Sequence, residues 1–443
     1  MLRKWIGNYN CETGFLSEVF EYLETEVKQK QYLKDVALIF DAMAIRIQIV
    51  YDVKSDKNKR YIDHGGIVTT NSNDLATEVL VFQIVSYTNR FKCPIAYVFI
   101  NKINADLQVH LIKYAIEKLY KTGIIVRSIT CDGAKTNIST LRLLGCNFSI
   151  DNMKTSFKHP QNESNIYCIL DPCHMIKLAR NTFAESNLTS ETGNISFSYI
   201  KQLHTIQETA NLKLANRLSY NHVYFKNKKM NVRLAAQALS SAVADAIDYM
   251  GKSGYKDFAN SEATVEFIHI FDRLFDMMNA RQIFGTGFKS PMMIQNLELF
   301  KQYFDYSVTY ISSLTIDGIN ILRHPRHTFA LGFVINTKSF YNLAYDLLHK
   351  KENTLRYFLP YKCSQDHIEL FFSCIRRRGG ENNNPNVLQF KWALRQLLFR
   401  NSVRASINAN CLGDTSETPS ILKFRTPNVQ YLMIKIYNKM KKN

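Results

Sequence analysis

The strongest constraint on the fold is the alternation of two apolar strands with one amphipathic helix between residues 93 and 131. CPIAYVFI, residues 93–100, and GIIVRSITC, residues 123–131, are apolar runs of strand length. Between them, apolar residues recur at three- and four-residue intervals from Ala105 to Lys121, which is the spacing of one helical face. A strand, a helix and a strand of this length predict a βαβ unit and therefore an α/β fold.

Another strand is expected before this unit. DVALIFDAMAIRIQIVYD begins with an apolar run from Val36 to Phe40, breaks at Asp41 and resumes with alternating apolar and polar residues from Ile45 to Ile49. The first part predicts a buried strand and the second part a half-exposed one. The apolar segment from Asp74 to Tyr87 leaves helix and strand both open.

From Asp171 onward the sequence favours successive helices. Asn231 is a helix cap before an alanine-rich segment, and Glu262 to Asn279 has apolar residues at helical spacing. We therefore expect a mostly helical insertion that divides the sheet domain. The expected parts are a helical lead-in, the first part of the sheet domain, the insertion, the second part of the sheet domain and a basic end, at residues 1–34, 35–169, 170–350, 351–400 and 401–443.

The segment QDHIELFFSCIRRRGGENNNPN, residues 365–386, predicts a helix with polar chemistry on one face. Its apolar stripe is formed by Ile368, Phe371, Phe372 and Ile375. Asp366 and Glu369 fall on a different face, and two glycines end the helix. The arginines before that end are Arg376, Arg377 and Arg378. The alternative is an ordinary solvated face.

The charge balance favours polyanionic partners. Lysine and arginine number 56 against 38 acidic residues, which gives a net charge of +18 and indicates nucleic acid first and an anionic membrane second. No apolar run approaches the ~20 residues that span a bilayer, and the start of the chain lacks a signal-peptide pattern. We expect an intracellular, soluble protein whose nine cysteines are reduced thiols.

Three acidic residues stand where a fold could bring them together. Asp41 follows an apolar strand, Asp132 ends another, and Glu369 lies on the late helix. Carboxylates are the hard oxygen ligands that Mg²⁺ prefers, and two ions about 3.5–4 Å apart can cut and join phosphodiesters. The alternatives are that Asp41 merely ends a strand and that Asp132-Gly133 is merely a turn.

Two other motifs are weaker indications of a functional site. GTGFKS, residues 285–290, has Phe288 where a Walker loop needs glycine. Cys168, Cys173 and His174 lack a second ligand pair at zinc-finger spacing, so buried thiols are expected there. The candidates for contacts to the DNA phosphates are the helix-terminal Arg376, Arg377 and Arg378, followed by Lys226, Lys228, Lys229 and the tail Lys435–Lys442. The three arginines are favoured, because they lie one or two turns beyond Glu369 and so near the proposed metals.

Six segments, in order, resemble the P-element transposases, the group that includes the THAP-domain transposases. They are LIFDAMAIR, GIIVRSITCDGAKTN, ILDPCHMIKLARN, MNVRLAAQALSSAVADAI, LFDMMNARQIFGTGFKSP and QDHIELFFSCIRRRGGENNNP, and the resemblance runs from about residue 2 to residue 400. It implies a ribonuclease-H-like mixed sheet with flanking helices, interrupted by a mostly helical GTP-binding insertion. The implied activity is cut-and-paste DNA transposition.

The resemblance also implies residues and partners. It carries an Asp, Asp, Glu catalytic and metal-binding triad onto Asp41, Asp132 and Glu369. It maps a guanine-nucleotide site onto Asp171, Lys177, Phe275, Asp276, Asn279 and Asp366. Asp171-Pro172 by itself is the ordinary start of a helix. The implied cofactors are Mg²⁺ or Mn²⁺ and GTP, the partner is DNA, and the implied state is a nuclear homo-oligomer on DNA without a membrane.

The sequence departs from the family in three places. Family members begin with a Cys-Cys-Cys-His zinc finger and a coiled coil, and neither is present in these residues. Ala42 and Ala44 replace the residues usual beside the first Asp, and the region after Asn401 is short. A truncated copy, a gene model without its first exon and a domesticated remnant all remain open. Beside the transposase core, we therefore keep a non-catalytic DNA-associated protein and a guanine-nucleotide-binding module as alternatives.

Overall fold

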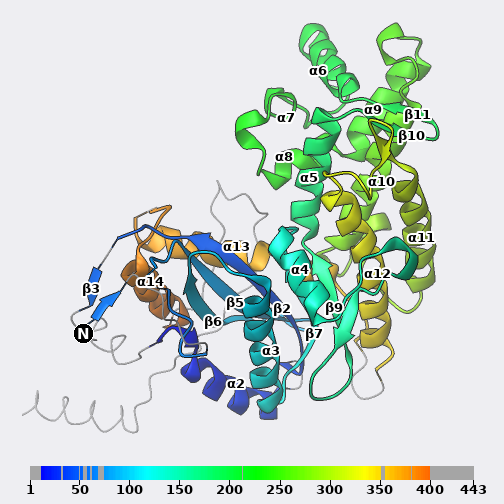
Figure 1. The fold of residues 1–443 in the computed structure, drawn as a ribbon. Helices are drawn as coiled ribbons and strands as arrows, with labels where there is room; N and C mark the ends of the chain where they lie inside the picture. The colour runs from blue at the N-terminus through cyan, green and yellow to red at the C-terminus, as the bar shows by residue number, and fades with distance from the viewer. Residues whose placement is uncertain are drawn as a thin grey trace, which may run out of the picture.

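A mixed seven-stranded sheet forms the centre of the first domain (Figure 1). The structure is a computed structural model that describes residues 11–30, 33–48, 50–52, 57–59, 62–67, 74–211, 213–350, 355–380 and 382–399. The strand order is β1-β6-β5-β2-β7-β9-β8. The bounds of these strands, in the same order, are Gly14–Phe15, Lys92–Ile100, Glu78–Ser86, Asp35–Ala44, Ile125–Cys131, Asn165–Leu170 and Ser156–Lys158. The expected α/β mixed sheet is confirmed.

The sheet changes from antiparallel to parallel at β2. Strand β2 pairs antiparallel with β5 and parallel with β7, and β7 pairs parallel with β9. The expected βαβ unit is confirmed, because α3 (Ala105–Lys121) connects β6 to β7 and two antiparallel steps across the sheet give these strands the same direction. Strands β2, β7 and β9 therefore end side by side at one edge.

Strand β2 extends further than the sequence indicated, and the next strand starts later. Its pairing with β5 continues through Asp41 to Ala44, so Asp41 lies inside the strand and not after it. The ladder stops because Ala44 already faces Glu78, the first residue of β5. Residues 45–48 have no regular secondary structure, so the predicted half-exposed strand is wrong there. The short hairpin strands β3 and β4 follow at Val50–Asp52 and Lys57–Lys59.

Helices cover both faces of the sheet. On one face Phe82 of β5 packs against Phe15, which also contacts Tyr114 of α3. On the other face, Tyr97 of β6 packs against Phe390. The remaining helices of this domain are α2 (Ser17–Gln29), α4 (Lys135–Leu144), α13 (Asp366–Arg378) and α14 (Val387–Phe399). The segment from Asp74 to Tyr87, left open by its pattern, contains strand β5.

A mostly helical insertion leaves the sheet after β9 and returns to it through α12, as the green-to-yellow lobe of Figure 1 shows. It also holds a small sheet of order β11-β10-β12-β13, which the sequence pattern did not indicate. Its helices are α5 (Pro172–Glu185), α6 (Ser198–Ala210), α7 (Tyr220–Val223), α8 (Val232–Ala238), α9 (Ser241–Lys252), α10 (Glu262–Met278), α11 (Leu297–Ser313) and α12 (Thr328–Leu348). The strands of the small sheet are Leu188–Ser190 (β10), Gly193–Ile195 (β11), Thr315–Ile316 (β12) and Ile319–Asn320 (β13). Among the described residues, no helix is both long and apolar enough to cross a bilayer.

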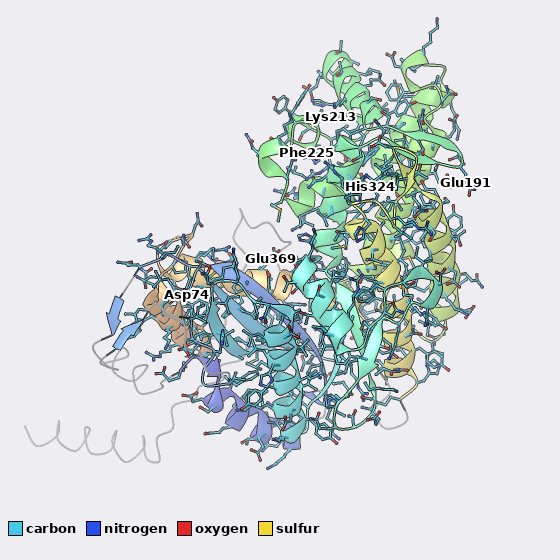
Figure 2. The ribbon with its side chains drawn as sticks, in the orientation of Figure 1. Asp74, Glu191, Lys213, Phe225, His324 and Glu369 are labelled. Atoms are coloured by element: carbon cyan, nitrogen blue, oxygen red, sulfur yellow. The ribbon has the colours of Figure 1, made fainter. Side chains whose placement is uncertain are left out.

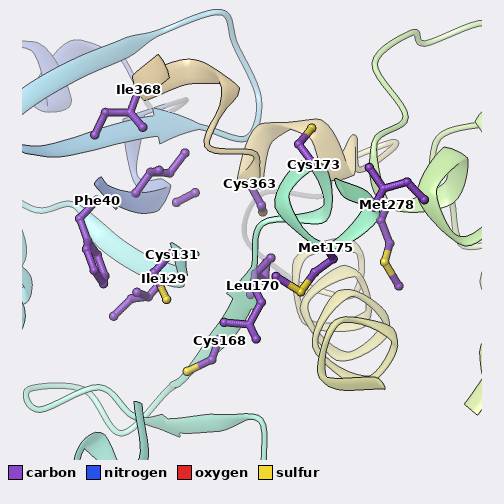
Figure 3. Close-up of a cluster of buried hydrophobic side chains, with 14 of the residues drawn as sticks. Phe40, Ile129, Cys131, Cys168, Leu170, Cys173, Met175, Met278, Cys363 and Ile368 are labelled. Atoms are coloured by element: carbon purple, nitrogen blue, oxygen red, sulfur yellow. The ribbon is translucent and has the colours of Figure 1, made fainter. Parts of the chain in front are cut away.

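The insertion is joined to the sheet by buried contacts. The amide of Asn336 on α12 donates to the Leu170 carbonyl at 2.6 Å and accepts from the Leu170 N–H at 2.9 Å. Figure 3 shows apolar side chains at this junction, including Phe40, Ile129 and Leu170 from three adjacent strands. Close packing is required here, since a Cβ added to Gly332 would lie 2.1 Å from Met175 Sδ.

Replacing Asn336 with leucine tests this junction. The substitution leaves the N–H and C=O of buried Leu170 without their partner, and each unsatisfied group costs about 1–3 kcal/mol. Urea unfolding should therefore show a lower midpoint for Asn336→Leu than for Asn342→Leu, a matched change on the half-buried side of the same helix. Equal midpoints for the two variants would contradict the junction described here.

Candidate active site

Three aspartates stand at the same level on three adjacent parallel strands. Asp132 directly follows β7, and Asp171 directly follows β9. Ile39 pairs with Thr130, and Cys131 pairs with Leu170. Asp41 and Asp132 each lie two residues beyond the pair Ile39–Thr130, so they are level with each other. Asp132 and Asp171 each lie one residue beyond the pair Cys131–Leu170 and are level in the same way. The strands therefore gather three carboxylates at one edge of the sheet.

Glu369 reaches this edge because the start of α13 is bound to the same strands. Asp171 Oδ1 accepts hydrogen bonds from Gln365 N–H at 3.0 Å and Ser364 Oγ at 3.2 Å. Gln365 Nε2 donates to the carbonyl of Phe40, the residue before Asp41, at 3.0 Å. Figure 2 shows Glu369 where α13 passes between the sheet and the insertion. We call Asp41, Asp132, Asp171 and Glu369 the carboxylate cluster.

The electrostatics show that the cluster is crowded with negative charge. Burial among protein atoms raises the pKa of Asp41 to about 8, and the carboxylates of Asp132, Glu369 and Asp171 contribute in the same direction. The Ala42 N–H opposes this by donating to Asp41 Oδ1 at 2.8 Å. Burial likewise raises the pKa of Glu369 to about 7, although the charge of Lys177 lowers it.

The cluster has the donor chemistry of a site for a hard divalent cation. Asp132 Oδ1 accepts from Ala134 N–H and Asn137 Nδ2, at 2.9 and 2.6 Å, as Asp41 Oδ1 does from Ala42. Among the described residues, Oδ2 of Asp41 and of Asp132 receives no hydrogen bond. Within the same residues, no three His, Cys, Asp or Glu side chains form a ready-made metal-binding group. Mutually repelling carboxylates with free oxygens nevertheless fit Mg²⁺ or Mn²⁺.

Asp171 acts as a structural member of the cluster. Its side chain is 1 % exposed, and its Oδ2 caps α5 by accepting from His174 N–H at 2.8 Å. With Oδ1 occupied by Ser364 and Gln365, both carboxylate oxygens have partners inside the protein. The helix-cap alternative for Asp171-Pro172 is confirmed.

A cavity of ≈ 1510 Å³ lies beside the cluster, between α8, α9, α10 and the start of α13. We call it the insertion cavity. Four of the six residues mapped to a nucleotide site line it, namely Phe275, Asp276, Asn279 and Asp366. The other two, Asp171 and Lys177, are not among its lining residues. Lys177 is buried and lies near enough to Glu369 to lower its pKa. The structure therefore divides the six between two neighbouring sites.

The insertion cavity has an excess of cations suited to an anionic ligand. Its lining includes Arg217, Lys228, Arg233, Arg281 and Lys289, against three acids. Asp272 is bonded to Ser241, and Asp276 pairs with Lys289 at 3.5 Å. Burial raises the pKa of Asp276 to about 6.

The third acid of the cavity, Asp366, is held by an arginine that the sequence pattern did not single out. Arg281 Nη2 lies 2.5 Å from Asp366 Oδ2, and the guanidinium stacks 3.8 Å from the ring centre of Tyr361. Asp366 is 1 % exposed, so the alternative of an ordinary solvated face does not hold for this residue. Arg281 lies within a family-like segment, but no periodicity marks it.

The basic candidates are placed differently from one another. Arg376 acts on Glu369, because its charge lowers the pKa of that carboxyl. Arg377 and Arg378 donate to Cys374 Sγ and Gln396 Oε1, both at 3.2 Å. Elsewhere, Lys226 begins a short 3₁₀ turn, Lys228 bonds Asn221 and Lys229 pairs with Glu185. The tail Lys435–Lys442 lies outside the described residues.

The cysteines form neither a disulfide nor a zinc group among the described residues. Eight of the nine are described, and all eight are free and buried. Cys168 Sγ lies 3.2 Å from Cys146 Sγ, while Cys173 contacts Ser364. The expectation of reduced, buried thiols is confirmed for these eight.

Three family models match successive parts of the chain and together cover more than half of it. They describe the TNP-like RNase H N-terminal domain at residues 11–145, the TNP-like GTP-binding insertion domain at 173–291 and the TNP-like RNase H C-terminal domain at 361–395. The match to the insertion-domain family ends at residue 291, so it does not extend to α12.

Known proteins match along most of the chain. DNA transposase THAP9 from Homo sapiens is 27 % identical over 90 % of it, and the Transposable element P transposase from Drosophila melanogaster is 25 % identical over 94 %. The chain spans 45 % and 52 % of these relatives. A structure of the Drosophila P element transposase strand transfer complex shares the fold, with a TM-score of 0.76, 24 % identity and coverage of 89 % of this chain and 83 % of that chain. With its ribonuclease-H-like sheet and GTP-binding-type insertion, the chain belongs to the TNP-like family of P-element transposases.

Proposed function

We propose that this chain is the core of a DNA transposase that cuts and joins phosphodiesters with divalent metal ions held by Asp41, Asp132 and Glu369. The carrying observation is the convergence of Asp41 and Asp132, from two adjacent parallel strands, with Glu369 of α13, where burial and the neighbouring carboxylates raise the pKa of Asp41 to about 8. A site with this excess of negative charge favours a bound cation. Family membership and the similarity to two transposases support the same activity.

The chain's own residues would divide the work as follows. When bound, two Mg²⁺ or Mn²⁺ ions would activate water or a 3′-hydroxyl and stabilise the leaving oxygen. Asp41 and Asp132 would bind them from a rigid sheet, and Glu369 from a helix fixed by Gln365. Asp171 would hold α13 in place without binding metal, because both of its oxygens have partners in the protein.

We assign GTP to the insertion cavity as an organising cofactor of the assembly. The cavity's cations suit a triphosphate, Phe275 supplies an aromatic surface and Asp366 supplies a carboxylate for N–H donors of a base. The match to a GTP-binding insertion domain supports this assignment. Of the six residues mapped earlier, Asp171 and Lys177 would act through the carboxylate cluster instead.

DNA is the proposed partner, and a nuclear homo-oligomer on DNA is the proposed state. The charge of +18 supports DNA binding, and the related P element transposase is known in a strand transfer complex. Arg376, Arg377 and Arg378 follow Glu369 on the same helix and are the proposed contacts to the DNA backbone, with Arg376 the one electrostatically closest to the carboxylates.

Replacing Asp132 with asparagine should abolish strand cleavage while leaving the fold intact, because asparagine keeps the oxygen that accepts from Ala134 and Asn137. We expect a loss greater than the ~10–100-fold that follows removal of an outer-shell partner at a metal site. The measurement is Mg²⁺- or Mn²⁺-dependent cleavage of a duplex carrying the terminal repeats that flank the coding sequence. Asp305→Asn, an exposed change on α11, is the control.

The outcome of this assay also separates the alternatives. Cleavage that survives in Asp132→Asn would contradict the assigned site. An unmodified chain that binds DNA or GTP but cuts nothing with either metal would identify a non-catalytic remnant.

The stability of the metal-free protein should fall as pH rises. The pKa of Asp41 is about 8 in the folded protein against an ordinary value of 3.8, and that of Glu369 is about 7 against 4.5. Between its ordinary pKa and its folded pKa, each of these groups binds more protons in the folded state than in the unfolded state. The free energy of unfolding is therefore greatest near the ordinary carboxyl pKa values and declines as the pH rises toward 8. Thermal unfolding in a chelator should show this decline, and Asp41→Asn should make it shallower.

Adding Mg²⁺ should reverse the decline, since the ion binds the ionised carboxylates of the folded state. The increase in melting temperature should be larger near pH 8 than near the unperturbed carboxyl pKa, and it should be small in Asp41→Asn at both. A Mg²⁺ effect that is independent of pH and of Asp41 would argue against cation binding at the cluster.

A further inference from the structure

One turn of the chain, residues 364–366, contacts both the carboxylate cluster and the insertion cavity. On the cluster side, Ser364 and Gln365 bind Asp171, and the Gln365 side chain binds the Phe40 carbonyl. On the cavity side, Asp366 lines the wall and pairs with Arg281. These residues are at most 4 % exposed, so the turn is packed within the protein on both sides.

One carboxylate oxygen of Asp366 lacks a strong hydrogen-bond donor. Its Oδ2 is paired with Arg281, whereas its buried Oδ1 receives no hydrogen bond from a nitrogen or oxygen donor among the described residues. The thiol of Cys173, a weak donor, lies close enough to lower the pKa of Asp366. Arg281 Nε is buried and unpartnered in the same way. A buried carboxylate oxygen without a donor is costly, and the adjoining cavity is large enough to hold a molecule that supplies one. The site is therefore incomplete without a ligand that donates hydrogen bonds, such as the N–H edge of a nucleobase.

We propose that ligand binding in the insertion cavity and cation binding at the carboxylates are coupled through this turn, with Gln365 as the positioning residue. The proposal rests on the function proposed above and adds its regulation. A ligand bonded to Asp366 fixes the first turn of α13, and Glu369 lies one turn further along the same helix. Gln365 ties that turn to the backbone beside Asp41. Occupation of either site thus stabilises the position of α13 that the other requires.

Thermodynamic linkage makes the coupling measurable without an activity assay. If the bound cation increases the affinity for the ligand by some factor, the bound ligand must increase the affinity for the cation by the same factor. Such factors are typically ~5–150-fold. The probe is a fluorescent GTP analogue, titrated with Mg²⁺ in large excess so that all nucleotide is metal-bound. Asp132→Asn removes the cation from the cluster and should lower the affinity for the GTP analogue by a factor in this range.

The Gln365→Met substitution should remove this dependence. Methionine has a similar length but cannot donate to the Phe40 carbonyl, so Asp132→Asn should change affinity by less than ~2-fold in that background, by the logic of a double-mutant cycle. Gln237→Met is the matched control, because Gln237 lines the same cavity but its side chain bonds His222 and not the Phe40 carbonyl. It should leave the effect of Asp132→Asn intact even if the affinity itself changes.

A second measurement uses the unmodified chain and does not depend on variants that fold. Guanosine lacks the phosphates that chelate metal, and it should tighten Mn²⁺ binding to the protein. The coupling is overturned, while the proposed function stands, if nucleotide and Mn²⁺ both bind but neither changes the affinity for the other. The same holds if Asp132→Asn lowers the affinity for the analogue equally with and without the Gln365→Met substitution. If the unmodified chain binds no GTP at all, the coupling and the assignment of GTP to the insertion cavity are overturned, whereas the proposed metal-dependent cleavage is decided by the Asp132→Asn assay.

Discussion

The burial of several carboxylates together at the end of the parallel strands is the constraint on which the rest of this structure depends. Strand pairing fixes Asp41, Asp132 and Asp171 at one edge, and α13 adds Glu369. Burial among protein atoms, together with the charges of Asp132, Glu369 and Asp171, raises the pKa of Asp41 from its ordinary value of 3.8 to about 8. The sheet thereby stores an electrostatic cost that a divalent cation can relieve.

The insertion is built into the same arrangement. It leaves the sheet through Asp171, whose carboxylate both caps α5 and binds the start of α13, and it returns through α12, whose Asn336 bonds both backbone groups of Leu170. The cavity in the insertion and the acids at the sheet edge are therefore connected through buried residues, with Asp366 at the cavity wall and Gln365 beside the acids. A ligand-binding domain inserted elsewhere on the sheet would lack this direct connection to Glu369.

Local patterns predicted local structure well. Helix α3 has the bounds that apolar spacing predicted, and the cap at Asp171 follows from the preference of Asp and Pro at helix starts. The end of β2 was misjudged because it depends on where its partner β5 begins. The pairing of Asp366 with Arg281 could not be predicted, because the two residues lie 85 positions apart and no periodicity connects them. The assignment of nucleotide residues came from resemblance alone, which did not separate the cluster from the cavity.

The central claim is that Asp41 and Glu369 hold protons in the absence of a cation and release them when a cation binds. Isothermal titration of Mg²⁺ at neutral pH, repeated in buffers of different ionisation enthalpy, measures protons released on binding. Because the pKa of Asp41 is about 8 and that of Glu369 about 7 in the metal-free fold, binding should release protons, and Asp41→Asn should reduce that release. Mg²⁺ binding without proton release, or equal release in Asp41→Asn, would contradict the account.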